Sequence, residues 1–323
     1  METIAKIEQI LGRIRMHPEY SACVGRRTLE RLQEEADRHS SALEAETGEI
    51  TTKEKEIFKS QSYERLVKAR EFLAVEGLEP YSLSCLGNIL EPEKNPARTF
   101  RTRSIQFGEF EGAEPGTILF GIKELTDRLQ EVSIHPVKRA TDAHISLISI
   151  HPYFDGNGRA ARLLQDVCLE SMAYPSGIIP VTDRGLYIHL MNRTVKDRKN
   201  FKSTVYEPSE SETLLQEFIG SKVLASAERL ESELQKRRFY TVGFSKIDSP
   251  NLSIRVKHLL AGSRITPNPL SVHLESEKNR REISFCVSGD IGYKELDERV
   301  KEIANKYSLK YKCELHRGCT SKK

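Results

Sequence analysis

Apolar residues recur every three or four positions through most of the chain before residue 235, which is the spacing of one face of a helix. The first such stripe is formed by Leu29, Leu32, Ala36 and Leu43. A second stripe begins after Thr51 and Glu54, which have the spacing of a capping box. It is formed by Tyr63, Leu66, Val67 and Leu73. Gly48 follows the first stripe, and Gly77 and Pro80 follow the second, so the pattern predicts two amphipathic helices with defined ends.

The pattern changes from helical spacing to alternation between residues 95 and 115. Polar Thr102, Ser104 and Gln106 separate Arg101, Arg103, Ile105 and Phe107. Gly108 and Gly112 follow, so this stretch predicts a short β-hairpin. A plain surface hairpin and a functional flap are both consistent with it.

Helical spacing then returns in two stripes. The first is formed by Ile118, Ile122, Leu125 and Leu129, and the second by Ala140, Ala143, His144 and Leu147. Pro152 disfavours helical geometry at the residue before it, so the second helix should end near His151. We interpret His144 as a packed core histidine. The last helix of this part carries Leu214, Phe218, Val223, Ala227 and Leu230.

Beyond Lys236 the pattern has a different character. Ile283, Phe285 and Val287 alternate with polar residues as in a strand. An amphipathic helix follows with Leu296, Val300 and Ile303, and a last strand with Leu309, Tyr311 and Cys313. These elements predict a small α+β domain over residues 237–323, and not a winged helix. Its 18 Lys and Arg against 10 Asp and Glu make it basic. Binding of nucleic acid, binding of an acidic protein and an ordinary solvated surface remain alternatives, and no RNA motif or zinc spacing supports the first.

Composition indicates a globular protein that is long enough for two domains, since the chain has 323 residues of which 38% are hydrophobic and 30% charged. No apolar run approaches the length of a membrane span, and the first residues lack the pattern of a signal peptide. The six cysteines form no Cys-x-x-Cys pair and are typical of reduced thiols. We therefore expect a cytoplasmic protein without membrane attachment.

The strongest chemical signal is the run His151-Pro-Tyr-Phe-Asp-Gly-Asn-Gly-Arg-Ala-Ala-Arg162. A glycine-flanked loop at the start of a helix suits anionic phosphates, and this loop contains Gly156, Asn157 and Gly158. Arg159 and Arg162 are three residues apart, so on a helix they should reach the same polyphosphate from one face. Asp155 is placed to hold the Mg²⁺ that accompanies a nucleoside triphosphate. His151 is the group that can accept a proton near neutral pH.

The run resembles the signature of the Fic family, His-Pro-Phe-x-Asp-Gly-Asn-Gly-Arg-x-x-Arg, with Tyr153 in place of Phe. The resemblance extends over about residues 30–235. It implies a mainly α fold, a Fic helical core with a β-hairpin flap, followed here by the small C-terminal α+β domain. We expect an N-terminal helical region over residues 1–90, a Fic core over 91–236 and the basic domain over 237–323.

The resemblance also implies an activity, the transfer of AMP from ATP to a hydroxyl of a protein. His151 would be the base, Asp155 the Mg²⁺ ligand, and the loop with both arginines the phosphate site. Gly158 favours AMP transfer, because Fic relatives that phosphorylate carry Lys at this position. Tyr187 lies in a segment similar to the family region that borders the adenine. It could stack on the base or be an ordinary core tyrosine.

Ser40 and Glu44 fit the family's inhibitory pattern Ser/Thr-x-x-x-Glu, although Ala45 stands where Gly or Asn is usual. The resemblance implies that Glu44 pairs with Arg162 and blocks the γ-phosphate of ATP. A solvated carboxylate is the alternative.

Three functions are consistent with the sequence. The first is an autoinhibited protein adenylyltransferase that acts on a Ser, Thr or Tyr hydroxyl of a protein target. The second is a Fic enzyme that removes AMP, with Glu44 aligning the attacking water. The third is a regulatory binding module that senses nucleotide and uses its basic tail to hold nucleic acid or a partner. Self-modification and a homodimer are also open.

Overall fold

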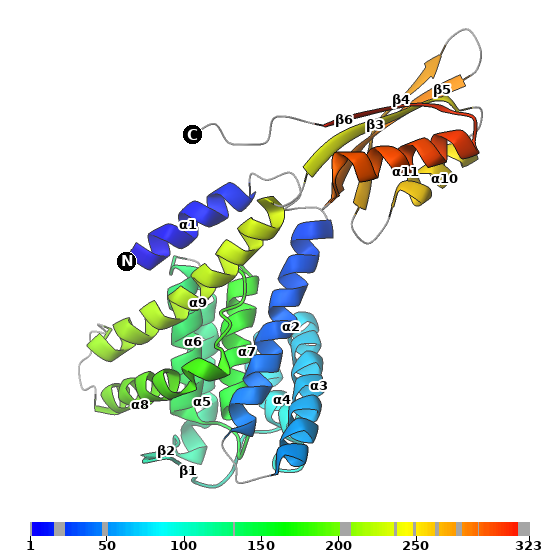
Figure 1. Ribbon diagram of the computed structural model, residues 1–323. Coiled ribbons are helices and arrows are strands. Elements are labelled where there is room, and N and C mark those ends of the chain that lie inside the picture. The colour runs from blue at the N-terminus through cyan, green and yellow to red at the C-terminus, as the bar shows by residue number, and fades with distance from the viewer. Residues whose placement is uncertain are drawn as a thin grey trace. The chain divides into compact units, whose positions relative to one another are not determined.

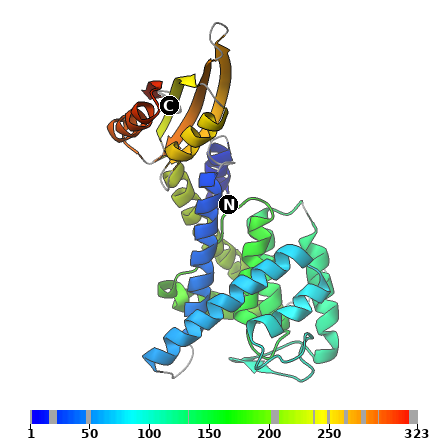
Figure 2. The same ribbon diagram turned by 90° about the vertical axis from the view of Figure 1, so that its right-hand side faces the viewer.

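The computed structural model describes most of the chain and is shown in Figures 1 and 2. The described residues are 2–15, 23–46, 51–131, 133–200, 208–235, 238–247, 250–261, 265–275, 280–289 and 291–315. Contacts divide the chain into two compact units. One unit combines Met1–Arg13 with Arg27–Leu230, and the other combines Ile14–Arg26 with Glu231–Lys323. The predicted division at residue 90 stays a prediction.

The first unit is built from helices, as the sequence predicts. In chain order they are α1 (Glu2–Arg15), α2 (Cys23–Ala45), α3 (Thr52–Glu76), α4 (Pro80–Leu90), α5 (Ile118–Leu129), α6 (Pro136–Ile150), α7 (Asn157–Glu170), α8 (Arg184–Asn200) and α9 (Glu210–Gln235). Helices α6 and α7 pack side by side at its centre, with α5 and α8 against α6 and with α3 and α4 against α7 (Figure 1). The candidate motif, His151–Arg162, lies in the connection between these two helices and in the first turns of α7.

Local signals in the sequence explain several helix boundaries. The predicted capping box is confirmed, because the Thr51 N–H donates to Glu54 Oε2 at 2.8 Å and Thr51 Oγ1 accepts from the Glu54 N–H. Gly77 ends α3 with a positive φ of 74°. Three helices of this unit, α1, α4 and α8, are additional to the predicted elements. Their buried residues include Ile7, Ile10, Leu11 and Ile14 in α1 and Leu83, Leu86 and Leu90 in α4.

The predicted hairpin is present but shorter than the alternating stretch. Its strands are β1 (Gln106–Phe107) and β2 (Phe110–Glu111), joined through Gly108 at φ 59°. The residues before β1 do not alternate as a strand, because Arg101 turns inward and is buried. Its guanidinium donates to the carbonyls of His151, Arg103 and Ala113 at 2.7, 2.7 and 2.5 Å. A buried arginine therefore ties the base of the hairpin to the motif.

The second unit confirms the predicted α+β tail. Its elements are β3 (Arg238–Ile247), α10 (Pro250–Leu260), β4 (Ile265–Glu275), β5 (Arg280–Gly289), α11 (Tyr293–Lys306) and β6 (Lys310–Leu315). The strands form one antiparallel sheet in the order β4-β5-β3-β6, which is the split βαβ topology of ferredoxin-like domains. Alternate residues of β3 and β5 form its core with both helices: Tyr240, Val242, Phe244, Ile283, Phe285 and Val287.

Two further sequence expectations concern the described residues. Cys85, Cys168 and Cys313 are free thiols, and the first two are buried. In the part of the chain that the structure describes, no helix combines the length and the apolar character that a membrane span requires.

Candidate active site

His151 lies at the corner between α6 and the following loop. Its backbone is left-handed, with φ 52° and ψ 61°, and its N–H still donates to the Leu147 carbonyl at 2.9 Å. The predicted effect of Pro152 is thereby confirmed, since α6 ends at Ile150. A left-handed residue other than glycine costs free energy, and strained backbone of this kind clusters at functional sites.

The His151 ring is held by a backbone carbonyl and by the hairpin. Nδ1 lies 3.3 Å from the Ile148 carbonyl, which can only accept, so this nitrogen carries the proton and Nε2 is the basic one. Phe107 of β1 stacks on the ring with 3.8 Å between centroids and 9° between planes. Burial lowers the pKa of His151 to about 4, with smaller contributions from Arg101 and Lys199. The imidazole is therefore neutral at physiological pH.

The loop after His151 leads directly into the first turn of α7. Gly156 has φ 88°, a value that favours glycine, and its N–H donates to Asp155 Oδ1 at 2.6 Å. The first helical bond of α7 runs from Ala160 N to Gly156 O, so the preceding N–H groups of the helix, at Asn157, Gly158 and Arg159, belong to its anion-binding end. The Asn157 side chain braces the loop instead of projecting from it. Its Oδ1 accepts from Tyr153 N at 3.0 Å, and its Nδ2 donates to Tyr153 O at 2.9 Å.

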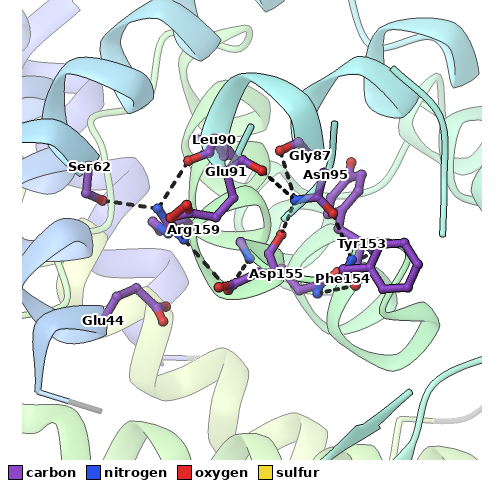
Figure 3. A network of polar contacts seen from close by, with 12 residues as sticks. Glu44, Ser62, Gly87, Leu90, Glu91, Asn95, Tyr153, Phe154, Asp155 and Arg159 are labelled. Atoms are coloured by element: carbon purple, nitrogen blue, oxygen red, sulfur yellow. Dashed lines mark hydrogen bonds and ion pairs between the residues drawn. The ribbon is translucent and has the colours of Figure 1, made fainter. Parts of the chain in front are cut away.

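Asn95, which the sequence analysis did not single out, fixes the loop from the other side (Figure 3). Its Nδ2 donates to the carbonyls of Gly87 and Asp155 at 3.0 Å each, and its Oδ1 accepts from Phe154 N at 2.9 Å. The side chain is buried, so these bonds satisfy groups that would otherwise be costly. A lone Asn in a polar connecting segment carries no sequence signal for this role.

Tyr153, the one departure from the family signature, has a specific partner. Its hydroxyl donates to the Leu83 carbonyl of α4 at 2.5 Å, and the side chain is fully buried. A Cβ at Gly87 would lie 2.6 Å from the Tyr153 ring, so α4 approaches the ring closely only because residue 87 is glycine.

The two signature arginines take different directions. Arg159 is enclosed by Ser62, Leu90 and Glu91 (Figure 3), and its Nη2 lies 3.1 Å from Glu91 Oε1 and 3.8 Å from Asp155 Oδ1. Its side chain is 2% exposed. The expectation that both guanidinium groups reach out from one helix face does not hold in this structure. Glu91, at the end of α4, gives Arg159 a buried partner that spacing along the sequence cannot reveal.

Arg162 points instead toward α2. Its Nη2 donates to Glu44 Oε1 at 2.6 Å, its Nε donates to Ser40 Oγ at 2.8 Å, and its Nη1 donates to the Tyr187 hydroxyl at 3.4 Å. The structure thus brings together the two positions of the Ser-x-x-x-Glu pattern and the last arginine of the motif. Burial alone would raise the pKa of Glu44, but the attraction of Arg162 outweighs it and lowers the pKa, so the carboxylate is ionised.

Gly158 leaves the room that this ion pair occupies. A Cβ there would lie 2.5 Å from Glu44 Oε1 and 3.3 Å from Arg162 Nη1. The Glu44 carboxylate therefore lies directly against the first turn of α7, where the anion-binding N–H groups begin.

Tyr187 and His144 form a buried chain behind Arg162. His144 Nε2 lies 2.9 Å from the Tyr187 hydroxyl, and His144 Nδ1 lies 2.8 Å from Gln165 Oε1. His144 is fully buried, so its interpretation as a core residue is confirmed. Tyr187 is also buried in this structure, within an apolar cluster that includes Leu43 and Phe218.

Asp155 is the one carboxylate of the loop, and its side chain is 52% exposed. Within the described residues no group of three or more His, Cys, Asp or Glu side chains could hold a metal ion. Mg²⁺ commonly binds one or two carboxylates and completes its coordination with substrate phosphates and water. An exposed carboxylate beside an anion-binding helix end fits that manner of binding.

Comparisons with known proteins agree with this geometry. Residues 84–169 match the family model of the Fic/DOC family. The chain carries a Fic domain. Protein adenylyltransferase fic-1 of Caenorhabditis elegans is 31% identical over 173 residues, which are 52% of this chain and 33% of that protein. Protein adenylyltransferase Fic of Drosophila willistoni is 37% identical over 95 residues, 28% of this chain and 19% of its own length.

Solved structures show the same fold around the Fic domain. A Fic domain containing signaling protein from Bacteroides thetaiotaomicron superposes with a TM-score of 0.57 at 20% identity, covering 71% of this chain and 98% of its own. Fic-1 (residues 134–508) from C. elegans superposes with a TM-score of 0.58 at 19% identity, covering 72% of each chain. The chain spans about a third of the length of the first curated relatives that it matches.

Proposed function

We propose that this protein is a Fic adenylyltransferase that transfers AMP from ATP to a hydroxyl of a protein target, and that Glu44 inhibits it. The observation that carries the proposal is the contact of Glu44 with Arg162 at 2.6 Å, directly against the first turn of α7. It places a carboxylate on the arginine that a nucleotide phosphate would otherwise bind. The names of the curated relatives support the same reaction class.

His151 accounts for the proton transfer in this proposal. Because Nδ1 faces the Ile148 carbonyl, Nε2 is available to take the proton of the attacking hydroxyl. The neutral state favoured by burial means that no prior deprotonation is needed at pH 7. The oxygen then attacks the α-phosphorus, a new P–O bond forms, and pyrophosphate leaves with the electron pair of the broken bond.

The start of α7 and Arg162 account for binding of the phosphates. The N–H groups of the first turn and the positive end of the helix favour negative charge at the loop. Arg162 is buried and is released for a phosphate only when Glu44 leaves it. Asp155 would hold Mg²⁺, which when bound neutralises phosphate charge. Arg159 acts in this proposal through Asp155 and the loop, as a buried cation beneath them.

The hairpin supplies the contact with the protein target. Phe107 of β1 covers the His151 ring, and Lys199 of α8 contacts the hairpin through the Glu111 carbonyl and both of its phenylalanines. A target segment that adds to this hairpin as a further strand would bring its Ser, Thr or Tyr hydroxyl to the histidine. Phe107 must then shift to admit it.

Removal of AMP is the second candidate function, and one observation favours it. The ionised Glu44 lies close enough to His151 to influence its pKa, so in this state the site holds a carboxylate and a neutral imidazole together. Such a pair could align and activate a water molecule on an adenylylated hydroxyl. The two functions differ in the role of Glu44, which blocks the first and performs the second.

Variants of Glu44 test the proposal. Glu44→Gly and the isosteric Glu44→Gln both remove the charge from Arg162, so both should incorporate more AMP from labelled ATP, on the protein itself or on added lysate proteins, than the wild type. The gain should be about tenfold or more, because a partly buried charge pair is worth a few kcal/mol. Equal labelling by all three proteins would reject inhibition by Glu44.

A chase separates the second candidate. Self-modified Glu44→Gly protein, freed of ATP, is mixed with unlabelled wild type. If the labelled protein loses AMP, and if that loss depends on Glu44 in the added protein, removal of AMP is favoured as the activity. Stable label would favour transfer.

A further inference from the structure

A second polar cluster joins the helix of Glu44 to the helix of the motif, two turns away from the nucleotide site. On α2, Asp37 precedes Glu44 by seven residues, so the two carboxylates lie on one face of the helix. On α7, Arg162 is followed at four-residue intervals by Asp166 and Glu170, which form a stripe along that helix. Glu44 meets Arg162 at one end of this seam, and Asp37 lies at the other.

Arg70 of α3 sits between the two acidic sets. Its Nε and Nη2 bind both oxygens of Asp37 at 3.1 and 2.8 Å, which is a bidentate contact. Its Nη1 donates to Glu170 Oε1 at 2.5 Å, and its Nη2 lies 4.0 Å from Asp166 Oδ2. One guanidinium thus binds carboxylates of both α2 and α7.

The cluster holds more negative than positive charge, and it is secluded from solvent. The side chains of Asp37 and Asp166 are 4% and 6% exposed. Burial, with a smaller contribution from Glu170, raises the pKa of Asp166 to about 7 against the lowering effect of Arg70. The Gly177 N–H and the Ser176 hydroxyl satisfy Asp166 and Glu170 on the α7 side, at 3.0 and 3.1 Å. Asp37 is held to this set through Arg70.

Removing Arg70 would leave three carboxyl groups between α2 and α7 without the cation that they share. The buried Asp37 would lose its bidentate partner, which is costly in a poorly solvated place, and the element that can respond is α2, because Asp166 and Glu170 are fixed on the central helix. Leu32, Ala36 and Leu43 still bury the apolar face of α2, so the helix would loosen without losing its core contacts entirely. Glu44, near the end of that helix, would follow the movement.

We propose that Arg70 anchors the inhibitory helix: by holding Asp37 of α2 to Glu170 and Asp166 of α7, it keeps Glu44 on Arg162 without touching the nucleotide site. The inference rests on the proposed inhibitory role of Glu44. Arg70 is a positioning residue, since it contacts Asp37, Glu170 and Asp166 and no atom of the nucleotide site.

The chain offers a matched control for this anchor. Arg229 of α9 also makes a bidentate contact with α2, to Glu35 at 2.9 and 2.7 Å, but its side chain is 54% exposed. Exposed ion pairs contribute little, so Arg229→Gln should leave activity and helix docking unchanged. A difference between the two arginines would therefore reflect the buried cluster and not the number of contacts to α2.

The experiment measures AMP incorporation from labelled ATP and hydrogen exchange of the α2 amides in the full chain. Arg70→Gln should raise incorporation several-fold and speed exchange in α2, Arg70→Lys should give an intermediate gain, and Arg229→Gln should give none. In the Glu44→Gly background Arg70→Gln should add nothing, because the inhibitory carboxylate is already gone. If Arg70→Gln folds poorly, Asp37→Asn releases α2 while leaving Arg70 paired with α7, and it should show the same rise.

The outcomes separate this inference from the proposed function. If Arg70→Gln and Asp37→Asn incorporate AMP at the wild-type rate while Glu44→Gly incorporates more, the anchor is overturned and inhibition by Glu44 stands. An unchanged Glu44→Gly would instead reject inhibition, and the regulatory role of Arg70 with it. Loss of activity on adding Arg70→Gln to Glu44→Gly would mean that Arg70 only supports the fold, which also overturns the proposal.

Discussion

The buried ion pair between Arg159 and Glu91 should contribute strongly to the stability of the first unit. Glu91 Oε1 lies 3.1 Å from Arg159 Nη2, and Glu91 Oε2 lies 2.9 Å from Arg65 Nη1. The change Glu91→Gln keeps the shape and an acceptor but removes the charge that compensates the Arg159 guanidinium. Asp155, at 3.8 Å and half exposed, is a poor replacement.

The size of the effect follows from burial. The side chains of Arg159 and Glu91 are 2% and 9% exposed, and leaving one member of such a pair without its partner costs about 3–5 kcal/mol. Because Gln can still accept a hydrogen bond, we expect about 3 kcal/mol, the lower end of that range. For a unit of this size that is a fall in Tm of about 6–12 °C.

Glu93→Gln is the matched control. Glu93 Oε1 binds the same Arg65 at 2.7 Å, but its side chain is 66% exposed. An exposed pair contributes about 0–1 kcal/mol, so this variant should melt close to the wild type.

Far-UV circular dichroism suits the measurement, because helices of the first unit dominate the described chain and the sequence has no tryptophan. Melting curves of wild type, Glu91→Gln and Glu93→Gln are compared at one pH and one salt concentration. Equal midpoints for the two variants would refute the assignment of Arg159 to a buried structural pair. The guanidinium would then have to be solvated or turned toward the nucleotide.

Other predictions follow from the same geometry. In a Glu44→Gly background, His151→Ala should abolish AMP transfer and leave ATP binding by calorimetry nearly unchanged, because it removes the base and no phosphate contact. Asp155→Ala should weaken the Mg²⁺ dependence of the rate, and an unchanged Mg²⁺ titration would place the metal elsewhere. In the pH–rate profile, the midpoint of the acidic side should lie well below pH 6.5, because burial lowers the pKa of His151 to about 4. A midpoint at pH 6.5 would show a solvated imidazole. Asp166→Asn should stabilise the fold more at pH 8 than at pH 5 in melting experiments. Burial raises the pKa of Asp166 to about 7, so the wild type loses stability as pH rises and this carboxyl ionises, and equal gains at both values would contradict the shift.

Periodicity and short-range signals predicted most of the helical unit. The stripe of Ile118, Ile122, Leu125 and Leu129 matches α5, whose bounds are Ile118 and Leu129. Thr51 with Glu54, and Pro152 after His151, marked true ends because capping and proline sterics act within a few residues. The predicted hairpin is longer than the observed one, because alternation alone does not reveal that the Arg101 side chain turns inward and donates to three backbone carbonyls.

The part of the site that the sequence did not predict depends on contacts between distant segments. Asn95 lies 60 residues before Asp155 of the loop, and Glu91 lies 68 residues before Arg159, and neither belongs to a pattern of its own. Arg159 and Arg162 are three residues apart, which is the spacing of neighbours on one helix face. Their guanidinium groups nevertheless point in different directions, because one binds Glu91 at the end of α4 and the other binds Glu44 of α2. Direction of a long side chain is decided by its partners, and these are visible only in the folded chain.

The position of the label that ATP leaves on protein distinguishes AMP transfer by His151 from every other use of the nucleotide. Glu44→Gly protein is incubated with ATP labelled at the α-phosphorus or at the γ-phosphorus, with Glu44→Gly/His151→Ala as the control. We expect α-label on protein, no γ-label, and neither label with the control, because His151 activates a hydroxyl that attacks the α-phosphorus. Retained γ-label, or equal α-label on the protein without His151, would contradict it.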